Sequence, residues 1–172
     1  MINGSMYRDM VVSAANAIEN VKEEINSLNI FPVPDGDTGI NMSLTMQSAK
    51  RNLVDFDGGL SECSEKVSSA LLRGGRGNSG VILSLFFRGI AKEFKGKNEA
   101  DSYTVAKAFK SGVESAYKAV RHPTEGTILT VMRLSAETAV DNAELYADDI
   151  HGFFNEILEA AVETLKKTPD ML

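Results

Sequence analysis

The chain has 172 residues, of which 43% are hydrophobic and 24% are charged. This length suffices for one domain with its own core, and the composition excludes a disordered chain. The formal net charge is -6 and no dense Lys/Arg block occurs, which argues against a nucleic-acid partner. Cys63 is the single cysteine, so an internal disulfide is excluded.

The N-terminus lacks a basic stretch followed by an apolar signal core. No apolar run in the chain reaches the roughly 20 residues needed to span a bilayer. We therefore expect a cytoplasmic protein without a transmembrane segment.

Helical periodicity begins near the N-terminus, where apolar residues recur at steps of three and four. Tyr7, Met10, Ala14 and Val21 belong to this series, which continues to Leu28 and predicts one buried stripe. Further helices are predicted at about 40–55, 60–73, 81–94, 102–120, 127–146 and 149–167.

Two caps and one unusual helix stand out among these segments. Ser61 or a neighbour is expected to cap the third helix, and Asp101 the fifth. The segment 81–94 is apolar nearly all round, which predicts a helix buried on most sides. No convincing strand, long linker or low-complexity tract occurs, so the chain is predicted to be one all-α domain over residues 1–172 with about seven helices.

The corner "NIFPVPDGDTGINM", residues 29–42, carries the main functional prediction. Its two prolines keep the chain extended, and Gly36 lets it turn so that Asp35 and Asp37 can point at a common centre. Gly39 then leads into a helix whose first N–H groups can face an anion. Mg²⁺ takes one or two carboxylates plus substrate phosphates, and would join the acidic pair to a phosphate chain.

The sequence of this corner invites two other interpretations. An EF-hand calcium loop is excluded, because positions 6 and 12 counted from Asp35 would be Ile40 and Met46 instead of Gly and Glu. A purely structural Asx turn with a helix cap remains an alternative.

A second glycine-rich corner, "RGGRGNSGV", occupies residues 73–81. It contains G-x-G-x-x-G, but a helix precedes it, so the dinucleotide-binding interpretation is rejected, and the Walker A pattern is incomplete. Asn78 or Ser79 is expected to cap the following helix and form a second anion cradle. A tight turn in which glycines serve only close packing is the alternative.

A third corner, "HPTEGTILTV" at residues 122–131, again places a glycine and a capping threonine before an apolar helix. The three corners together suggest three helix starts around one ligand. His122 and His151 are interpreted as surface residues rather than catalytic ones.

The three corners, in this order and spacing, resemble the nucleotide-binding L-subunit family of dihydroxyacetone kinase (DhaL-like). Within it, they are most similar to the N-terminal domain of the bacterial fatty acid kinase A subunit. The motifs cover residues 29–131, and the helical pattern extends the resemblance to nearly the whole chain. The resemblance implies an antiparallel α-helical barrel or bundle of seven to eight helices that holds a nucleotide at one rim.

The resemblance also implies roles for individual residues. Asp35 and Asp37 would bind two Mg²⁺ ions that bridge the phosphates of ATP or ADP, and would thereby carry the phosphoryl transfer. The other implied contacts are Thr38, Gly39 and Asn41 to phosphate or metal, Ser79 and Gly80 to phosphate, and Gly126 and Thr127 near the nucleoside.

Two departures from the family are mild and one bears on the metal site. Ile40 and Gly75 replace an expected Thr and Ala and remove no polar group. The dihydroxyacetone branch has a third aspartate upstream of the pair. This sequence offers Asn29 nearby, as the fatty acid kinase branch does.

The implied function is that of a kinase domain acting on a fatty acid. A separate fatty-acid-binding protein of the DegV type would present the acyl substrate, and the product would be an acyl phosphate. The early stop at Leu172 suggests an excised domain that is weakly active alone, with a homodimer forming through the rest of a longer chain. Alternatives are transfer to dihydroxyacetone on a partner subunit and a non-catalytic helical domain that binds lipid or an apolar partner.

Overall fold

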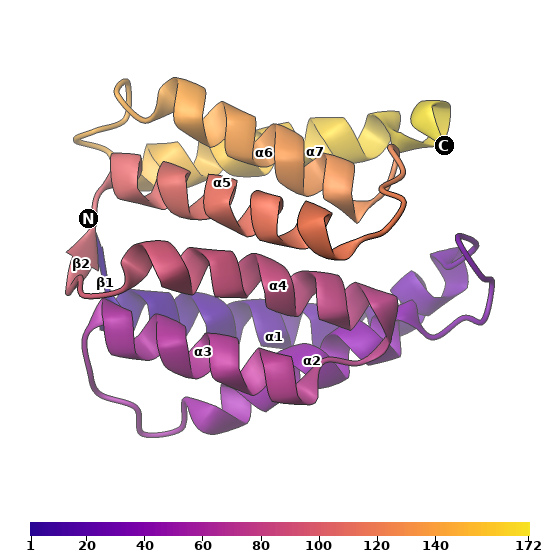
Figure 1. Ribbon diagram of the computed structural model, residues 1–172, viewed down its shortest axis with the longest axis horizontal. Coiled ribbons are helices and arrows are strands. Elements are labelled where there is room, and N and C mark those ends of the chain that lie inside the picture. The colour runs from indigo at the N-terminus through magenta and orange to yellow at the C-terminus, as the bar shows by residue number, and fades with distance from the viewer.

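The computed structural model describes all 172 residues, and seven helices make up most of the chain (Figure 1). Each helix lies within a few residues of its predicted range, so the all-α prediction is confirmed. The helices are α1 (Gly4–Leu28), α2 (Thr38–Asn52), α3 (Leu60–Gly74), α4 (Gly77–Phe94), α5 (Ser102–Ala119), α6 (Ile128–Asn142) and α7 (Ile150–Met171).

Successive helices run in opposite directions along the long axis of the molecule (Figure 1). Helices that are neighbours in sequence pack against each other, and α1 also contacts α3 while α2 also contacts α4. The antiparallel arrangement places the α1–α2, α3–α4 and α5–α6 connections at one end of the bundle (Figure 1). All three predicted ligand-binding corners therefore lie at the same end.

Two very short strands, which the sequence did not predict, join the N-terminus to the α4–α5 connection. β1 (Ile2–Asn3) pairs antiparallel with β2 (Glu99–Ala100). Two residues are too few to show an alternating pattern, so periodicity could not reveal them. Asn3 also caps α1, since its side-chain oxygen accepts a hydrogen bond from the Met6 N–H at 2.9 Å.

The stripe predicted on α1 is wrong beyond its first residue. The buried residues of α1 are Gly4, Tyr7, Val11 and Ala15, of which the last three follow a four-residue step. Met10 and Val21, by contrast, are 39% and 40% exposed. The two series share Tyr7 but then diverge around the helix, and only the second faces the neighbouring helices.

The core is linked across the bundle by aromatic contacts. Phe86 on α4 packs edge-on against Phe109 on α5, with ring centroids 5.7 Å apart, and Phe109 packs against Phe154 on α7 at 6.4 Å. Edge-to-face pairs of this kind add about 1 kcal/mol each to apolar burial. The apolar helix α4 accordingly lies between α3 and α5, although its Val81 is 48% exposed. No helix is both long and apolar enough to cross a membrane.

Helices α4 and α5 make their closest approach at a pair of glycines. A Cβ placed on Gly89 would lie 2.4 Å from the Ser111 carbonyl oxygen and 2.5 Å from the Gly112 backbone. Side chains larger than hydrogen are therefore excluded at this crossing. The glycines allow the two backbones to pack directly on each other.

Of the two predicted helix caps described here, one is confirmed and one is wrong. Asp101 caps α5, because its carboxylate accepts a hydrogen bond from the Thr104 N–H at 2.8 Å. Ser61 does not cap α3, which begins at Leu60 after Gly59 and has no side-chain cap. The Ser61 hydroxyl instead accepts a hydrogen bond from the Gly96 N–H at 2.8 Å.

Candidate functional site

The aspartate corner between α1 and α2 takes the shape that its sequence predicts. Gly36 adopts a φ of +67°, a left-handed conformation that other residues rarely tolerate. Asp37 then occupies the N-cap position of α2, but its side chain makes no capping hydrogen bond. Its carboxylate therefore stays available, against the alternative that the motif is only a cap.

The two carboxylates of the corner face each other. The pKa of Asp35 is raised above its ordinary value, first because the Asp37 side chain lies within hydrogen-bonding reach, then through loss of solvation and the charge of Asp37. Two negative charges within hydrogen-bonding reach repel each other, which favours a proton on one carboxylate or a bound cation. Nowhere does the structure gather three or more His, Cys, Asp or Glu side chains that could hold a metal. The corner thus offers a cation two carboxylates and no third side chain of these types.

Two asparagines at the C-terminal end of α1, Asn26 in its last turn and the C-cap Asn29, hold the corner in place. The Asn29 side-chain oxygen accepts a hydrogen bond from the Asp37 N–H at 3.2 Å, while its amide nitrogen donates to the Val33 carbonyl at 3.2 Å. The Asn26 side-chain oxygen accepts from the Ile40 N–H at 3.1 Å. The sequence analysis missed Asn26 altogether, because its partner lies 14 residues away.

Gly39 has a packing role that the sequence analysis did not foresee. A Cβ at this position would lie 1.9 Å from the Lys22 carbonyl oxygen, so the first turn of α2 rests directly on α1. Thr38, the first helical residue, is half-buried beside it. The N–H groups of both residues belong to the first turn, where a helix offers no internal acceptor.

The second glycine corner lies against the first turns of α2. The Arg76 N–H donates to the Thr45 hydroxyl at 3.0 Å. A Cβ on Gly77 would lie 2.6 Å from the Asn41 side-chain nitrogen, and one on Gly80 would lie 2.4 Å from the Thr45 hydroxyl. The structure therefore brings the starts of α2 and α4 together, as predicted for a shared site.

The predicted cap of α4 is wrong in its position. The helix begins at Gly77 with Arg76 as N-cap and no side-chain capping bond. Asn78 and Ser79 consequently lie inside the first turn, where their own N–H groups have no helical acceptor. The Gly80 N–H, in contrast, already donates to the Arg76 carbonyl at 3.0 Å.

The third corner lies at the same end of the bundle but contacts a different neighbour. Thr127 caps α6 as predicted, with its hydroxyl accepting from the Leu129 N–H at 3.3 Å. Gly126 is buried, and a Cβ there would lie 2.8 Å from the Leu172 nitrogen. This corner thus lies under the last turn of α7, and His122 on it is exposed.

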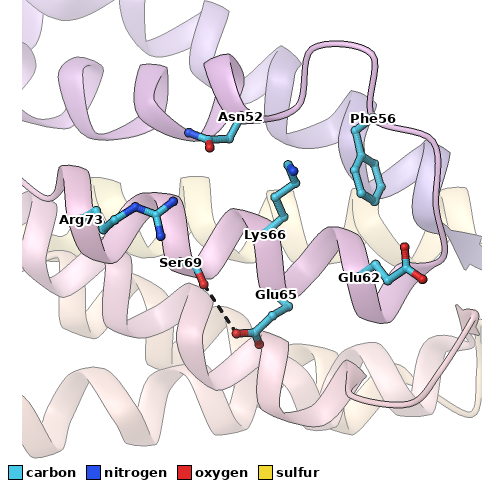
Figure 2. A pocket seen from close by; sticks show the side chains of 7 residues that line it. All are labelled: Asn52, Phe56, Glu62, Glu65, Lys66, Ser69 and Arg73. Carbon is cyan, nitrogen blue, oxygen red and sulfur yellow. Dashed lines mark hydrogen bonds between the residues drawn. The ribbon is translucent and has the colours of Figure 1, made fainter.

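Two surface grooves lie apart from the aspartate corner. One, of about 460 Å³, runs between the end of α2 and the outer face of α3 (Figure 2). It is lined by Asn52, Phe56, Glu62, Glu65, Lys66, Ser69 and Arg73. The other, of about 440 Å³, lies between α5 and α6 and includes Arg133 and Glu137. Neither groove contains an aspartate of the corner, where Asp35 is exposed and Asp37 is half-buried.

Comparison with known proteins places this geometry in a family. Residues 32–172 match the DAK2 domain. The match covers most of the chain, including both aspartates and both glycine corners, and the chain therefore belongs to this family. DAK2 domains are kinase-type domains of the dihydroxyacetone kinase L-subunit type, which bind ATP or ADP.

The relatives found are bacterial proteins of greater length. The chain is 43% identical over 172 residues to "Uncharacterized protein SERP0792" of Staphylococcus epidermidis, covering 99% of this chain and 31% of that protein. It is 44% identical to "Uncharacterized protein SAB1090" of Staphylococcus aureus, with the same coverage. The chain thus spans about a third of the length of these relatives.

Proposed function

We propose that this chain is the nucleotide-binding domain of a kinase that phosphorylates a fatty acid. The observation that carries the proposal is the pair of facing carboxylates, Asp35 and Asp37, beside the adjoining N-termini of α2 and α4. The carboxylates attract cations, whereas the two helix N-termini beside them attract anions. A polyanion with divalent cations satisfies both.

The residues of the corner fit magnesium. Oxygen ligands from one or two carboxylates are what Mg²⁺ takes from a protein when phosphates supply the rest. The Asp37 side chain is not used as a cap, and neither carboxylate is part of an ion pair. Asp35 and Asp37 would hold two Mg²⁺ ions, which when bound neutralise charge on the β- and γ-phosphates.

The chain's own backbone would complete the phosphate site. The N–H groups of Thr38 and Gly39 at the start of α2, and of Asn78 and Ser79 at the start of α4, have no acceptor within their helices. The side chain of Asn41 lies between the two starts, next to Gly77. These groups would orient the nucleotide, because positioning and charge stabilisation supply most of the catalysis in phosphoryl transfer.

The proposed acceptor is the carboxylate of a fatty acid held by a separate binding protein. A carboxylate oxygen would form a bond to the γ-phosphorus while the bond from that phosphorus to the β-phosphate oxygen breaks, giving acyl phosphate and ADP. Support comes from Asn29, which stands near the pair where the dihydroxyacetone branch carries a third carboxylate. Because the chain spans about a third of its relatives, the groups that present the acceptor would lie outside it.

Isothermal titration with ADP tests the nucleotide site directly. We expect binding by the wild-type chain in the presence of Mg²⁺, little binding with EDTA, and loss of binding in Asp37→Asn. Asp148→Asn is the control, since this exposed aspartate lies in the α6–α7 connection at the opposite end of the bundle. Equal binding by wild type and Asp37→Asn, or no binding at all, would contradict the proposal.

The acceptor class needs a separate assay. Hydroxylamine converts acyl phosphates to hydroxamates, so ATP and a loaded fatty-acid-binding protein should give hydroxamate when the relevant full-length kinase is present. ADP release with dihydroxyacetone, without hydroxamate from fatty acid, would favour the dihydroxyacetone branch instead.

A further inference from the structure

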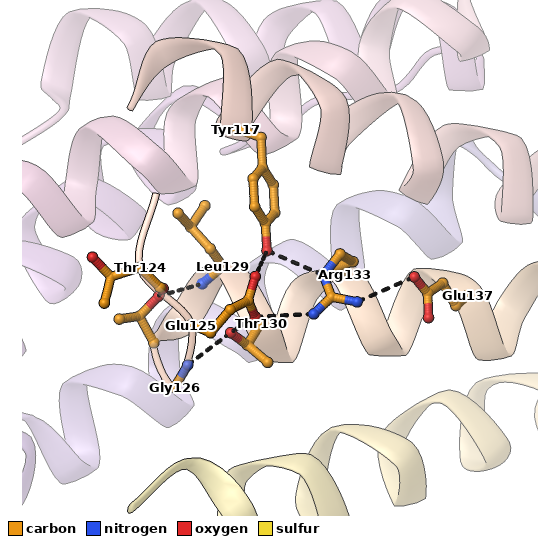
Figure 3. Close-up of polar contacts among 9 residues, drawn as sticks. Tyr117, Thr124, Glu125, Gly126, Leu129, Thr130, Arg133 and Glu137 are labelled. Atoms are coloured by element: carbon orange, nitrogen blue, oxygen red, sulfur yellow. Dashed lines mark hydrogen bonds and ion pairs between the residues drawn. The ribbon is translucent and has the colours of Figure 1, made fainter. Parts of the chain in front are cut away.

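A cluster of polar side chains fixes the third corner to the bundle (Figure 3). We call it the Glu125 cluster. Its members come from the end of α5, from the corner itself and from the first three turns of α6. They are Tyr117, Glu125, Thr130, Arg133 and Glu137.

Glu125 is the centre of this cluster and accepts hydrogen bonds from three donors. The Thr130 hydroxyl donates at 2.5 Å, the Arg133 guanidinium at 2.9 Å and the Tyr117 hydroxyl at 3.4 Å. These bonds, that of Thr130 first and that of Arg133 second, hold the pKa of Glu125 below its ordinary value. The carboxylate is therefore ionised and held in one orientation at neutral pH.

The cluster acts on the backbone of the corner through Thr130. The Thr130 hydroxyl, on a residue only 1% exposed, also accepts a hydrogen bond from the Gly126 N–H at 2.9 Å. Gly126 has a φ of +83°, a conformation that needs outside support to be the single one populated. The chain from Glu125 to Gly126 is thus tied to α6 by both its side chain and its backbone.

The exposure of the cluster argues against a mainly stabilising role. The side chains of Glu125 and Arg133 are 51% and 35% exposed, and ion pairs of this exposure contribute little to folding. Several donors that converge on one carboxylate do, however, restrict a loop to one geometry. A restricted loop binds a ligand with a smaller loss of conformational entropy.

We infer that Glu125 is a positioning residue for nucleoside recognition: through the buried Gly126 it holds the half-buried Thr127 in the geometry that receives the nucleoside. The inference rests on the proposed function and on the resemblance, which implies that Gly126 and Thr127 lie near the nucleoside while the aspartates hold the phosphates. Glu125 would act through the loop and would not contact the nucleotide. Replacing Glu125 should consequently weaken the binding of nucleotides more than the binding of ligands that consist of phosphate alone.

The experiment compares two ligands by isothermal titration below the unfolding temperature. We expect Glu125→Gln to weaken Mg²⁺·ADP binding about tenfold. The reason is that a less ordered loop loses more conformational entropy when the nucleotide binds. Binding of Mg²⁺·pyrophosphate should stay within about twofold of wild type, and so should binding of Mn²⁺ alone. Circular dichroism establishes that the variant is folded.

Matched variants separate positioning from a general effect. Glu137→Gln removes the other carboxylate partner of Arg133, 3.3 Å away, without touching the corner, and should leave ADP binding unchanged. Thr130→Val removes the link to Gly126, and should act like Glu125→Gln, whereas Thr130→Ser retains the hydroxyl and should restore binding.

The outcomes distinguish a failure of the positioning role from a failure of the proposed function. If Glu125→Gln binds ADP as wild type does, or loses ADP and pyrophosphate equally, the positioning role is wrong while the nucleotide site stands. If wild-type protein binds neither ligand, the proposed function fails and the inference fails with it.

Discussion

Asn29 and Asp37 are joined by a hydrogen bond in which the asparagine side-chain oxygen accepts from the aspartate N–H at 3.2 Å. The other end of the same amide donates to the Val33 carbonyl, so Asn29 closes the loop that carries both aspartates. In this structure its amide holds the loop. An asparagine here organises two carboxylates where a third carboxylate would have added to their repulsion.

Replacing Asn29 by alanine tests this role. Asn29→Ala should weaken Mn²⁺ binding about tenfold, because Asp37 loses its anchor, and should lower the free energy of unfolding by about 1 kcal/mol. Asn16→Ala is the matched control: Asn16 also bridges α1 to α2, through Lys50 at 2.6 Å, but lies away from the corner. Equal Mn²⁺ affinity in wild type and Asn29→Ala, measured by electron paramagnetic resonance, would refute the role.

The facing carboxylates predict an unusual pH dependence of stability. The pKa of Asp35 is raised in the folded state, so the folded protein binds this proton more tightly than the unfolded chain does. The stability contributed by the protonated pair is therefore present below the ordinary pKa of 3.8 and is lost as the pH rises through the raised value. In EDTA at neutral pH, Asp35→Asn should be more stable than wild type, and the difference should vanish at acidic pH.

Divalent cations should reverse the order of stability of wild type and Asp35→Asn. In the proposed function Mg²⁺ binds the native wild-type pair, so it should raise the thermal midpoint of wild type above that of Asp35→Asn. Asp148→Asn, far from the corner, should match wild type in both buffers. A variant Asp35→Asn that is no more stable than wild type in EDTA would mean that the two charges do not repel.

The contact between α2 and α4 is tested at Gly77, which has a φ of +64° and faces the Asn41 side chain. Gly96 is the control, because it has a similar φ of +78° but no atom within 4 Å of its missing Cβ. Gly96→Ala should show only the backbone strain of about 1 kcal/mol. Gly77→Ala should lose about 1–2 kcal/mol more, because the added methyl also displaces Asn41.

Urea unfolding of the two glycine variants gives this difference directly, since strain is common to both. Equal destabilisation would show that the start of α4 does not rest on α2.

Tyr7 gives a prediction that is independent of function. Its hydroxyl is buried without a hydrogen-bond partner, and burial raises its pKa far above the ordinary value. Removing an unsatisfied buried hydroxyl relieves a desolvation penalty, so Tyr7→Phe should raise the free energy of unfolding by about 1 kcal/mol. Tyr103→Phe, at a position 46% exposed, should be neutral. A destabilised Tyr7→Phe would indicate that the hydroxyl has a partner, such as a buried water.

The helices were predictable because helical periodicity is repeated over many residues, and the caps Asp101 and Thr127 because their partners lie two or three residues away. Two contacts that the sequence did not reveal share one physical cause. Ser61 bonds to Gly96, 35 residues away, and Thr45 to Arg76, 31 residues away. Such partners are set by how helices pack, which no local pattern records.

The candidate site likewise has features that the local sequence predicts and features that it does not. The turn at Gly36 and the availability of Asp35 and Asp37 followed from the motif itself. The roles of Asn26 and Asn29 did not, because an asparagine near a helix C-terminus has no local feature that names its partner. The packing role of Gly39 against Lys22 was hidden for the same reason.

A crystal structure of the chain with Mn²⁺ and ADP, with the manganese located by its anomalous scattering, tests the central claim most directly. The account predicts anomalous peaks on the Asp35 and Asp37 carboxylates, with the ADP phosphates reaching the first turns of α2 and α4. Manganese bound elsewhere, or ADP seated away from these helix starts, would contradict it.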